Sequence, residues 1–197
     1  DLLAVYMAKR LGRIDDARCA QLVEDISALP ERCQRAIDLN SRIKCLADMY
    51  HTQSALFFIG RNLDYAASLE ASLKLKEISY IHSEAYAAGE LKHGTIALID
   101  ENQLVVALAC QTRLFEKLMS NIKECKARGA QVLALAQEGE RRIYAEADEV
   151  LSVPQTDALL LPIPEMIPLQ LFAYYVAKAN GCDIDKPKNL AKSVTVE

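Results

Sequence analysis

The residues Ala-Leu-Phe-Phe-Ile-Gly at positions 55–60 form a continuous apolar run that ends in a glycine. A run this short, without polar alternation, predicts a strand buried on both faces, as in a parallel sheet covered by helices. A helical pattern follows at about 63–79, and a second apolar run, Leu-Val-Val-Ala-Leu-Ala, occupies 104–109. Strand, helix, strand is the beginning of an α/β sheet.

The same alternation continues toward the C-terminus. Two more strands are predicted at 132–136 and 149–153. We expect the helices between and after them at 113–128, capped by Thr112 and closed by Gly129, and at about 165–180, ending at Gly181. The pattern predicts a three-layer, doubly wound, flavodoxin-like α/β domain with a parallel sheet.

The first fifty residues have a helical pattern throughout. An amphipathic helix at 1–11 runs up to a glycine, and Asp15 or Asp16 can cap the next helix. Pro30 predicts the first turn of a further helix that runs to residue 50. We interpret this region as helices that belong to the end of a preceding domain.

Composition excludes several classes of function. The 197 residues are 51% hydrophobic and carry a net charge of −4, with a sequence pI of about 5.5. This balance offers no electrostatic surface for nucleic acid or an anionic membrane. No apolar run approaches the roughly 20 residues that span a bilayer, and no signal peptide opens the chain. We expect a cytoplasmic protein.

Motifs for cofactors and metals are absent from the sequence. No two of the six cysteines have Cys-x-x-Cys spacing, so we expect buried thiols of a reducing compartment and no metal site. The sequence has no Gly-x-Gly-x-x-Gly, Walker or Gly-x-Ser-x-Gly motif. We expect no cofactor. Ligands of such sheets bind at the carboxyl ends of strands, here at 60–62 and 110–112.

Residues 73–94 are dense in titratable groups. Lys74 and Glu77 are three residues apart and would share one face of a helix. An exposed ion pair of about 0–1 kcal/mol is the usual interpretation of this spacing. The functional alternative is a carboxylate that moves a proton, tuned by the cation. For His82 we favour a structural role, and for His93, beside Gly94 at a loop end, a functional one.

Two strings in the chain resemble one enzyme family. KLKEISYIHSEAYAAGELKHG (residues 74–94) and NLAKSVTVE (189–197) are similar to the corresponding stretches of the glutamine–fructose-6-phosphate amidotransferases, also called glucosamine-6-phosphate synthases. The resemblance runs through the whole chain. It implies the end of a first sugar-isomerase (SIS) lobe and a connector at 1–46, a second SIS lobe at 47–187, and an active-site tail at 188–197.

The resemblance also implies roles for individual residues. Lys192 matches the tail lysine that forms a Schiff base with the carbonyl of open-chain fructose 6-phosphate. Glu77 matches the carboxylate that carries a proton between C1 and C2, and Lys74 matches the lysine near it. His93 matches the histidine that assists ring opening in the site of the neighbouring subunit of a homodimer. Ala191 is expected to contact the substrate.

The implied function is the isomerase part of an enzyme that makes glucosamine 6-phosphate from fructose 6-phosphate and glutamine. The phosphate-binding loop of the first SIS lobe and the glutaminase domain have no counterpart in these residues, so we expect little or no turnover by the chain alone. The alternatives are a non-catalytic SIS module that binds phosphosugars for regulation, and a dimerisation module.

Overall fold

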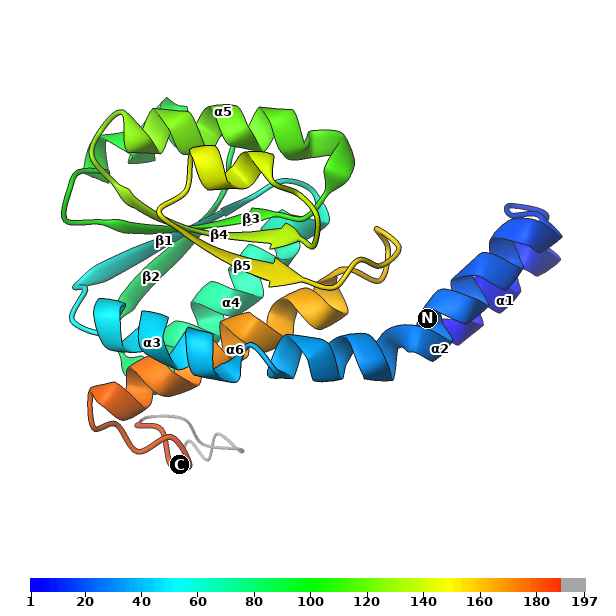
Figure 1. Cartoon of the computed structure of the whole chain (residues 1–197), viewed down its shortest axis with the longest axis horizontal. Helices are drawn as coiled ribbons and strands as arrows, with labels where there is room; N and C mark the ends of the chain where they lie inside the picture. Colours follow the sequence, from blue (N-terminus) through cyan, green and yellow to red (C-terminus); the bar gives the residue numbers. More distant parts are fainter. Residues whose placement is uncertain (189–197) are drawn as a thin grey trace, which may run out of the picture.

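The computed structural model describes residues 1–188. Five parallel strands form one sheet in the order β2-β1-β3-β4-β5 (Figure 1). Their bounds are β1 (Ala55–Gly60), β2 (His82–Ala87), β3 (Leu104–Ala109), β4 (Gln131–Gln137) and β5 (Glu149–Val153). Four of these strands confirm the predicted ones, and the α/β fold class is confirmed with them.

Strand β2 is the element that the sequence analysis missed. Its residues, His-Ser-Glu-Ala-Tyr-Ala, pair only with β1 at the edge of the sheet. An edge strand keeps one side open to solvent, so it needs no continuous apolar run. The polar residues that suggested a functional site at 73–94 are therefore also the reason why β2 was not predicted.

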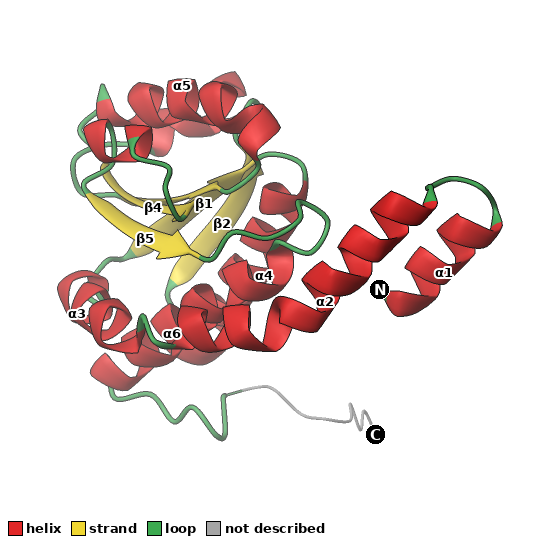
Figure 2. Cartoon of the chain, turned by 45° about the vertical axis from the view of Figure 1, so that its right-hand side comes forward, coloured by secondary structure: helices red, strands yellow, loops and turns green. Residues whose placement is uncertain are grey.

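Helices cover both faces of the sheet (Figures 1 and 2). Helix α5 (Phe115–Lys126) lies on one face. Helices α3 (Asn40–Tyr50), α4 (Leu63–Ser79) and α6 (Pro162–Ala179) lie on the other. Alternate strand residues point to opposite layers: Phe58 and Val106 belong to the core on the α4 side, whereas Phe57 and Val105 belong to the core on the α5 side. Each core is closed by helical side chains.

The N-terminal helices form an arm. Helix α1 (Leu2–Arg10) packs along the first part of α2 (Asp16–Ile37), and both project beyond the sheet (Figure 2). The predicted cap is confirmed, because the Asp15 side chain accepts the Arg18 N–H at 2.7 Å. The helix boundary predicted at Pro30 is wrong. Pro30 lies inside α2, where its missing N–H removes a single helical hydrogen bond, and the chain breaks after Ile37 instead.

The ends of the later helices test two further predictions. Gly129 and Gly181 follow α5 and α6 with φ of +89° and +68°, as expected of residues that end a helix. Thr112 is not the cap of α5. It begins a 3₁₀ turn, η3 (Thr112–Leu114), and α5 starts only at Phe115. The chain leaves the sheet through this tighter turn, so the helix begins later than its sequence pattern suggests. Across residues 1–188, no helix is both long and apolar enough to cross a membrane.

Candidate functional site

One cleft lies where the strand order reverses. From β1 the chain connects to β2 on one side, while β3 lies on the other, so the loops after β1 and β3 diverge there. A cleft of about 710 Å³ opens at this point, lined by Asn62 and Leu63 after β1, residues 111–114 after β3, and residues 157–159 after β5. The two segments expected to bind ligand, 60–62 and 110–112, thus meet at one cleft.

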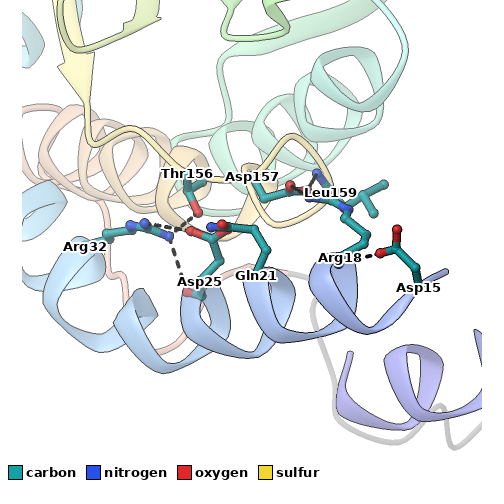
Figure 3. Close-up of polar contacts among 8 residues, drawn as sticks. All are labelled: Asp15, Arg18, Gln21, Asp25, Arg32, Thr156, Asp157 and Leu159. Atoms are coloured by element: carbon teal, nitrogen blue, oxygen red, sulfur yellow. Dashed lines mark hydrogen bonds and ion pairs between the residues drawn. The ribbon is translucent and has the colours of Figure 1, made fainter. Parts of the chain in front are cut away.

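Helix α2 fixes the loop on one side of this cleft (Figure 3). Arg18 forms an ion pair with Asp157 at 2.6 Å, and this bond lowers the pKa of Asp157. About four turns further along α2, Arg32 donates to Thr156 at 2.6 Å and pairs with the buried Asp25 at 2.8 Å. The loop after β5 is therefore held by two arginines of one helix.

Two buried carboxyl groups lie on the packed helices α4 and α6. Asp64, in the first turn of α4, accepts the backbone N–H groups of Cys110 and Gln111 at 2.9 and 3.1 Å, which ties the start of α4 to the end of β3. Its other oxygen, and both oxygens of the fully buried Glu165, have no hydrogen-bond partner within the described part of the chain. The sequence analysis missed both residues.

Burial controls the ionisation of these groups. It raises the pKa of Asp64 to about 6, against the opposing effect of the two backbone N–H bonds. Burial and then the charge of Asp64 raise the pKa of Glu165 well above its usual value. Within residues 1–188, no three His, Cys, Asp or Glu side chains are placed to hold a metal ion. Both carboxyls therefore bind a proton more tightly than exposed Asp and Glu side chains do.

Lys74 and Glu77 lie together on α4, as predicted. The Lys74 ammonium is 2.8 Å from the Glu77 carboxylate and 3.6 Å from that of Glu70. The hydrogen bond to Glu77 raises the pKa of Lys74. Both side chains are partly exposed, at 35% and 25%. The geometry fits a surface ion pair and a paired catalytic carboxylate equally well.

The structure does not bring Glu77 and His93 together within one chain. Helix α4 runs back from the end of β1 to the start of β2, so Glu77 lies near the edge where β2 begins. His93 ends the 3₁₀ turn η1 (Leu91–His93), beyond the other end of β2. The six residues of β2 span about 20 Å. His93 is exposed at that far edge.

His82 begins β2, at the same end of the strand as Glu77 and at the opposite end from His93. It starts β2 with 68% of its side chain exposed, and its Nε2 is 3.5 Å from a Glu84 oxygen. It does not line the cleft. Nothing in its surroundings gives it a catalytic role.

The C-terminal segment returns to the end of α4. The Lys188 N–H donates to the Tyr80 hydroxyl at 2.7 Å, and the Lys188 ammonium lies 5.2 Å from the centre of the Tyr80 ring. Tyr80 follows α4 in the left-handed conformation, with φ of +61°. The predicted site residues Ala191 and Lys192 lie outside the described residues. The last described residue is thus next to the helix end that carries Glu77.

Comparison with known proteins identifies the family. Residues 49–178 match the SIS domain. The chain belongs to the SIS domain family. This SIS chain is 48% identical over its whole length to the glutamine–fructose-6-phosphate aminotransferase (isomerizing) of Clostridium tetani and 53% identical to that of Symbiobacterium thermophilum, in each case over 32% of the relative. It therefore spans about a third of the length of these curated relatives.

Solved structures agree with this assignment. The C-terminal domain of glucosamine-fructose-6-phosphate aminotransferase from Francisella tularensis superposes with a TM-score of 0.89 at 34% identity, over 94% of the SIS chain and 52% of that chain. The tagatose-6-phosphate ketose/aldose isomerase of Escherichia coli shares the fold, with a TM-score of 0.72 at 18% identity, over 89% of the SIS chain and 48% of its own. The resemblance first noted at residues 74–94 is confirmed.

Proposed function

We propose that this SIS chain is the C-terminal isomerase lobe of a glutamine–fructose-6-phosphate amidotransferase. The whole enzyme converts D-fructose 6-phosphate and L-glutamine into D-glucosamine 6-phosphate and L-glutamate. In this proposal residues 1–46 end the first SIS lobe and connect it, 47–187 form the second SIS lobe, and 188–197 are the active-site tail. The enzyme acts in the cytoplasm.

The observation that carries the proposal is the contact between Tyr80 and Lys188. Tyr80 is three residues beyond Glu77, about 4.5 Å along the helix axis. Lys192 is four residues beyond Lys188, and four residues reach at most about 14 Å. The chain length therefore allows the tail lysine and the helix carboxylate to reach one substrate, which supports a shared site.

The chemistry assigns a role to each group. The Lys192 amine condenses with the C2 carbonyl of open-chain fructose 6-phosphate and releases water, which gives an imine that accepts electrons. Ammonia then adds to C2 and displaces Lys192, which regenerates the lysine amine and leaves the sugar as a free C2 imine. Glu77 takes a proton from C1 of this imine and returns it to C2, as one base serving adjacent carbons. Lys74, bonded to Glu77 at 2.8 Å, holds the direction of that carboxylate. Ala191 contacts the sugar beside Lys192.

The opposite positions of Glu77 and His93 support a homodimer. Ring opening needs a group that exchanges protons near neutral pH, for which histidine is suited. Since the length of β2 separates His93 from Glu77 of its own chain, His93 acts in the site of the partner subunit. The first SIS lobe supplies the phosphate-binding loop, and the glutaminase domain supplies ammonia. Without them the chain alone has little or no turnover.

The test separates the two half-reactions in the full-length enzyme. Lys192→Arg keeps the positive charge but cannot form a Schiff base with a sugar. We expect this variant to lose glucosamine 6-phosphate formation and to keep glutamine hydrolysis. Product formation near the wild-type rate would overturn the assignment of Lys192. Lys188→Arg, in the same tail, is the matched control and should keep both activities.

A further inference from the structure

The guanidinium of Arg61 lies between the end of β1 and the turn that leads to His93. We propose that Arg61 is a positioning residue for His93: its guanidinium forms the surface against which the backbone of residues 88–93 packs. The proposal rests on the function proposed above. It is argued from the contacts of Arg61 with α5 and with Gly89.

Arg61 is anchored on helix α5. Its Nε and Nη2 both donate to the Asn121 side-chain oxygen, at 3.2 and 2.8 Å. Asn121 is 4% exposed, and its own amide donates to Glu124 at 3.1 Å. A guanidinium bonded through two nitrogens to a buried amide is fixed in direction as well as in place.

Gly89 packs directly against this fixed guanidinium. A Cβ on Gly89 would lie 3.1 Å from Nη2 and 3.3 Å from Nη1 of Arg61, closer than ordinary contact. The absence of a side chain therefore lets the backbone approach the cation. Next to it, the Ala88 N–H donates to the Gly60 carbonyl at 2.9 Å, so the ends of β1 and β2 are joined at the same level.

Backbone hydrogen bonds hold the turn from Gly89 to His93. The Glu90 N–H donates to the Ala87 carbonyl at 2.8 Å, and the His93 N–H donates to the Glu90 carbonyl at 3.0 Å. Leu91 is fully buried and holds the middle of the turn in the core. The His93 side chain is exposed, so the backbone of this turn fixes its place. Moving the guanidinium would move the turn.

The decisive experiment uses mixed dimers of the full-length enzyme, purified through two different tags. If His93 acts in the partner's site and Arg61 positions it, loss of Arg61 impairs the same site as loss of His93 from that chain. Arg61→Ala paired with Glu77→Gln leaves one complete site, and we expect about half of the wild-type glucosamine 6-phosphate formation. Arg61→Ala paired with His93→Ala leaves no complete site, and we expect no recovery over the homodimers.

Two results would overturn the proposal. One is equal recovery in both mixed dimers. The other is no recovery in either while the pair Glu77→Gln with His93→Ala recovers. The pair Glu77→Gln with His93→Ala tests the shared site itself. No recovery of activity in that pair would contradict the proposed function, and this result differs from one that contradicts only the role of Arg61. Arg128→Ala is the matched control, because Arg128 lies beyond the same helix and bonds only the Glu124 carbonyl among the described residues.

A second measurement does not depend on subunit exchange. Loss of a placed general acid or base costs about 10²-fold or more in kcat. An analogue of fructose 6-phosphate without the 5-hydroxyl cannot close its ring and needs no ring opening. We expect Arg61→Ala and His93→Ala both to lose about 10²-fold with fructose 6-phosphate and to recover most of it with the analogue. An equal loss of Arg61→Ala with both substrates would contradict a positioning role.

Discussion

The backbone N–H of Lys188 donates to the hydroxyl of Tyr80 at 2.7 Å, and so the C-terminal segment is attached to the end of α4. Tyr80 holds a left-handed conformation that costs a residue with a side chain roughly 1–2 kcal/mol. That conformation ends α4 and directs the ring toward Lys188. The arrangement links the helix of Glu77 to the segment that leads to Lys192.

Tyr80→Phe tests this link. It keeps the ring and removes the hydroxyl that accepts the Lys188 N–H. A hydrogen bond of this kind contributes about 1 kcal/mol, which corresponds to roughly a fivefold effect. We therefore expect kcat/KM for glucosamine 6-phosphate formation to fall about fivefold while glutaminase activity is unchanged. Tyr144→Phe, which removes a hydroxyl bonded to Ser152, is the control. Equal effects of the two variants would count against the link.

The buried carboxyls predict a specific pH dependence of stability. The folded pKa of Asp64 is about 6, raised from 3.8, so the folded state binds this proton more tightly than the unfolded state. The stability gained from this tighter proton binding is present below about pH 4 and is lost as the pH rises through 6. Glu165, with its pKa also raised, acts in the same direction.

Glu165→Gln tests this effect, because it removes the titration of Glu165 together with its interaction with Asp64. We expect the melting temperature of the variant, relative to that of the wild type, to rise between pH 4 and pH 7. Thermal unfolding followed by circular dichroism measures the difference at each pH. A difference that stays constant over this range would show that the pair does not hold an extra proton.

The arginines of α2 predict unequal contributions to stability. Arg32→Ala leaves the carboxylate of Asp25, whose side chain is 9% exposed, without its cation. We expect a loss of about 2–3 kcal/mol, somewhat less than for a fully buried pair because Arg32 is 20% exposed. Arg35→Ala removes a pair with Glu138 in which both side chains are at least 40% exposed, and should cost at most about 1 kcal/mol.

Urea unfolding of the two variants decides this prediction. The double variant Arg32→Ala with Asp25→Ala completes a thermodynamic cycle and gives the energy of the pair itself. Equal losses for Arg32→Ala and Arg35→Ala would mean that the attachment of α2 to the loop after β5 is no stronger than a surface contact.

Much of the fold follows from local pattern. The apolar runs at 55–60 and 104–109 are buried on both faces, and such runs have few alternatives in an α/β chain. Helix α4 was predicted with its observed limits. Strand β2 was not predicted, because it forms a strand through pairing with β1 and not through an apolar pattern of its own. Pro30 misled because an exposed helix tolerates one lost hydrogen bond.

The site depends on relationships that no local pattern contains. Asp64 and Glu165 are about a hundred residues apart in sequence and interact only because α4 and α6 pack together. Gly89 could be recognised as a turn residue, but its contact with Arg61 requires the three-dimensional end of the sheet. The positions of Glu77 and His93 at opposite ends of β2 likewise follow from topology, and they support the proposal of a site shared between subunits.

The most direct test of a catalytic tail is chemical trapping of the sugar on Lys192. Full-length enzyme is incubated with fructose 6-phosphate and reduced with borohydride, and its peptides are analysed by mass spectrometry. The Schiff base should be fixed as a sugar phosphate adduct on Lys192, and the adduct should be missing from Lys192→Arg. An adduct found only on Lys186 or Lys188, or none at all under conditions of full activity, would contradict the assignment.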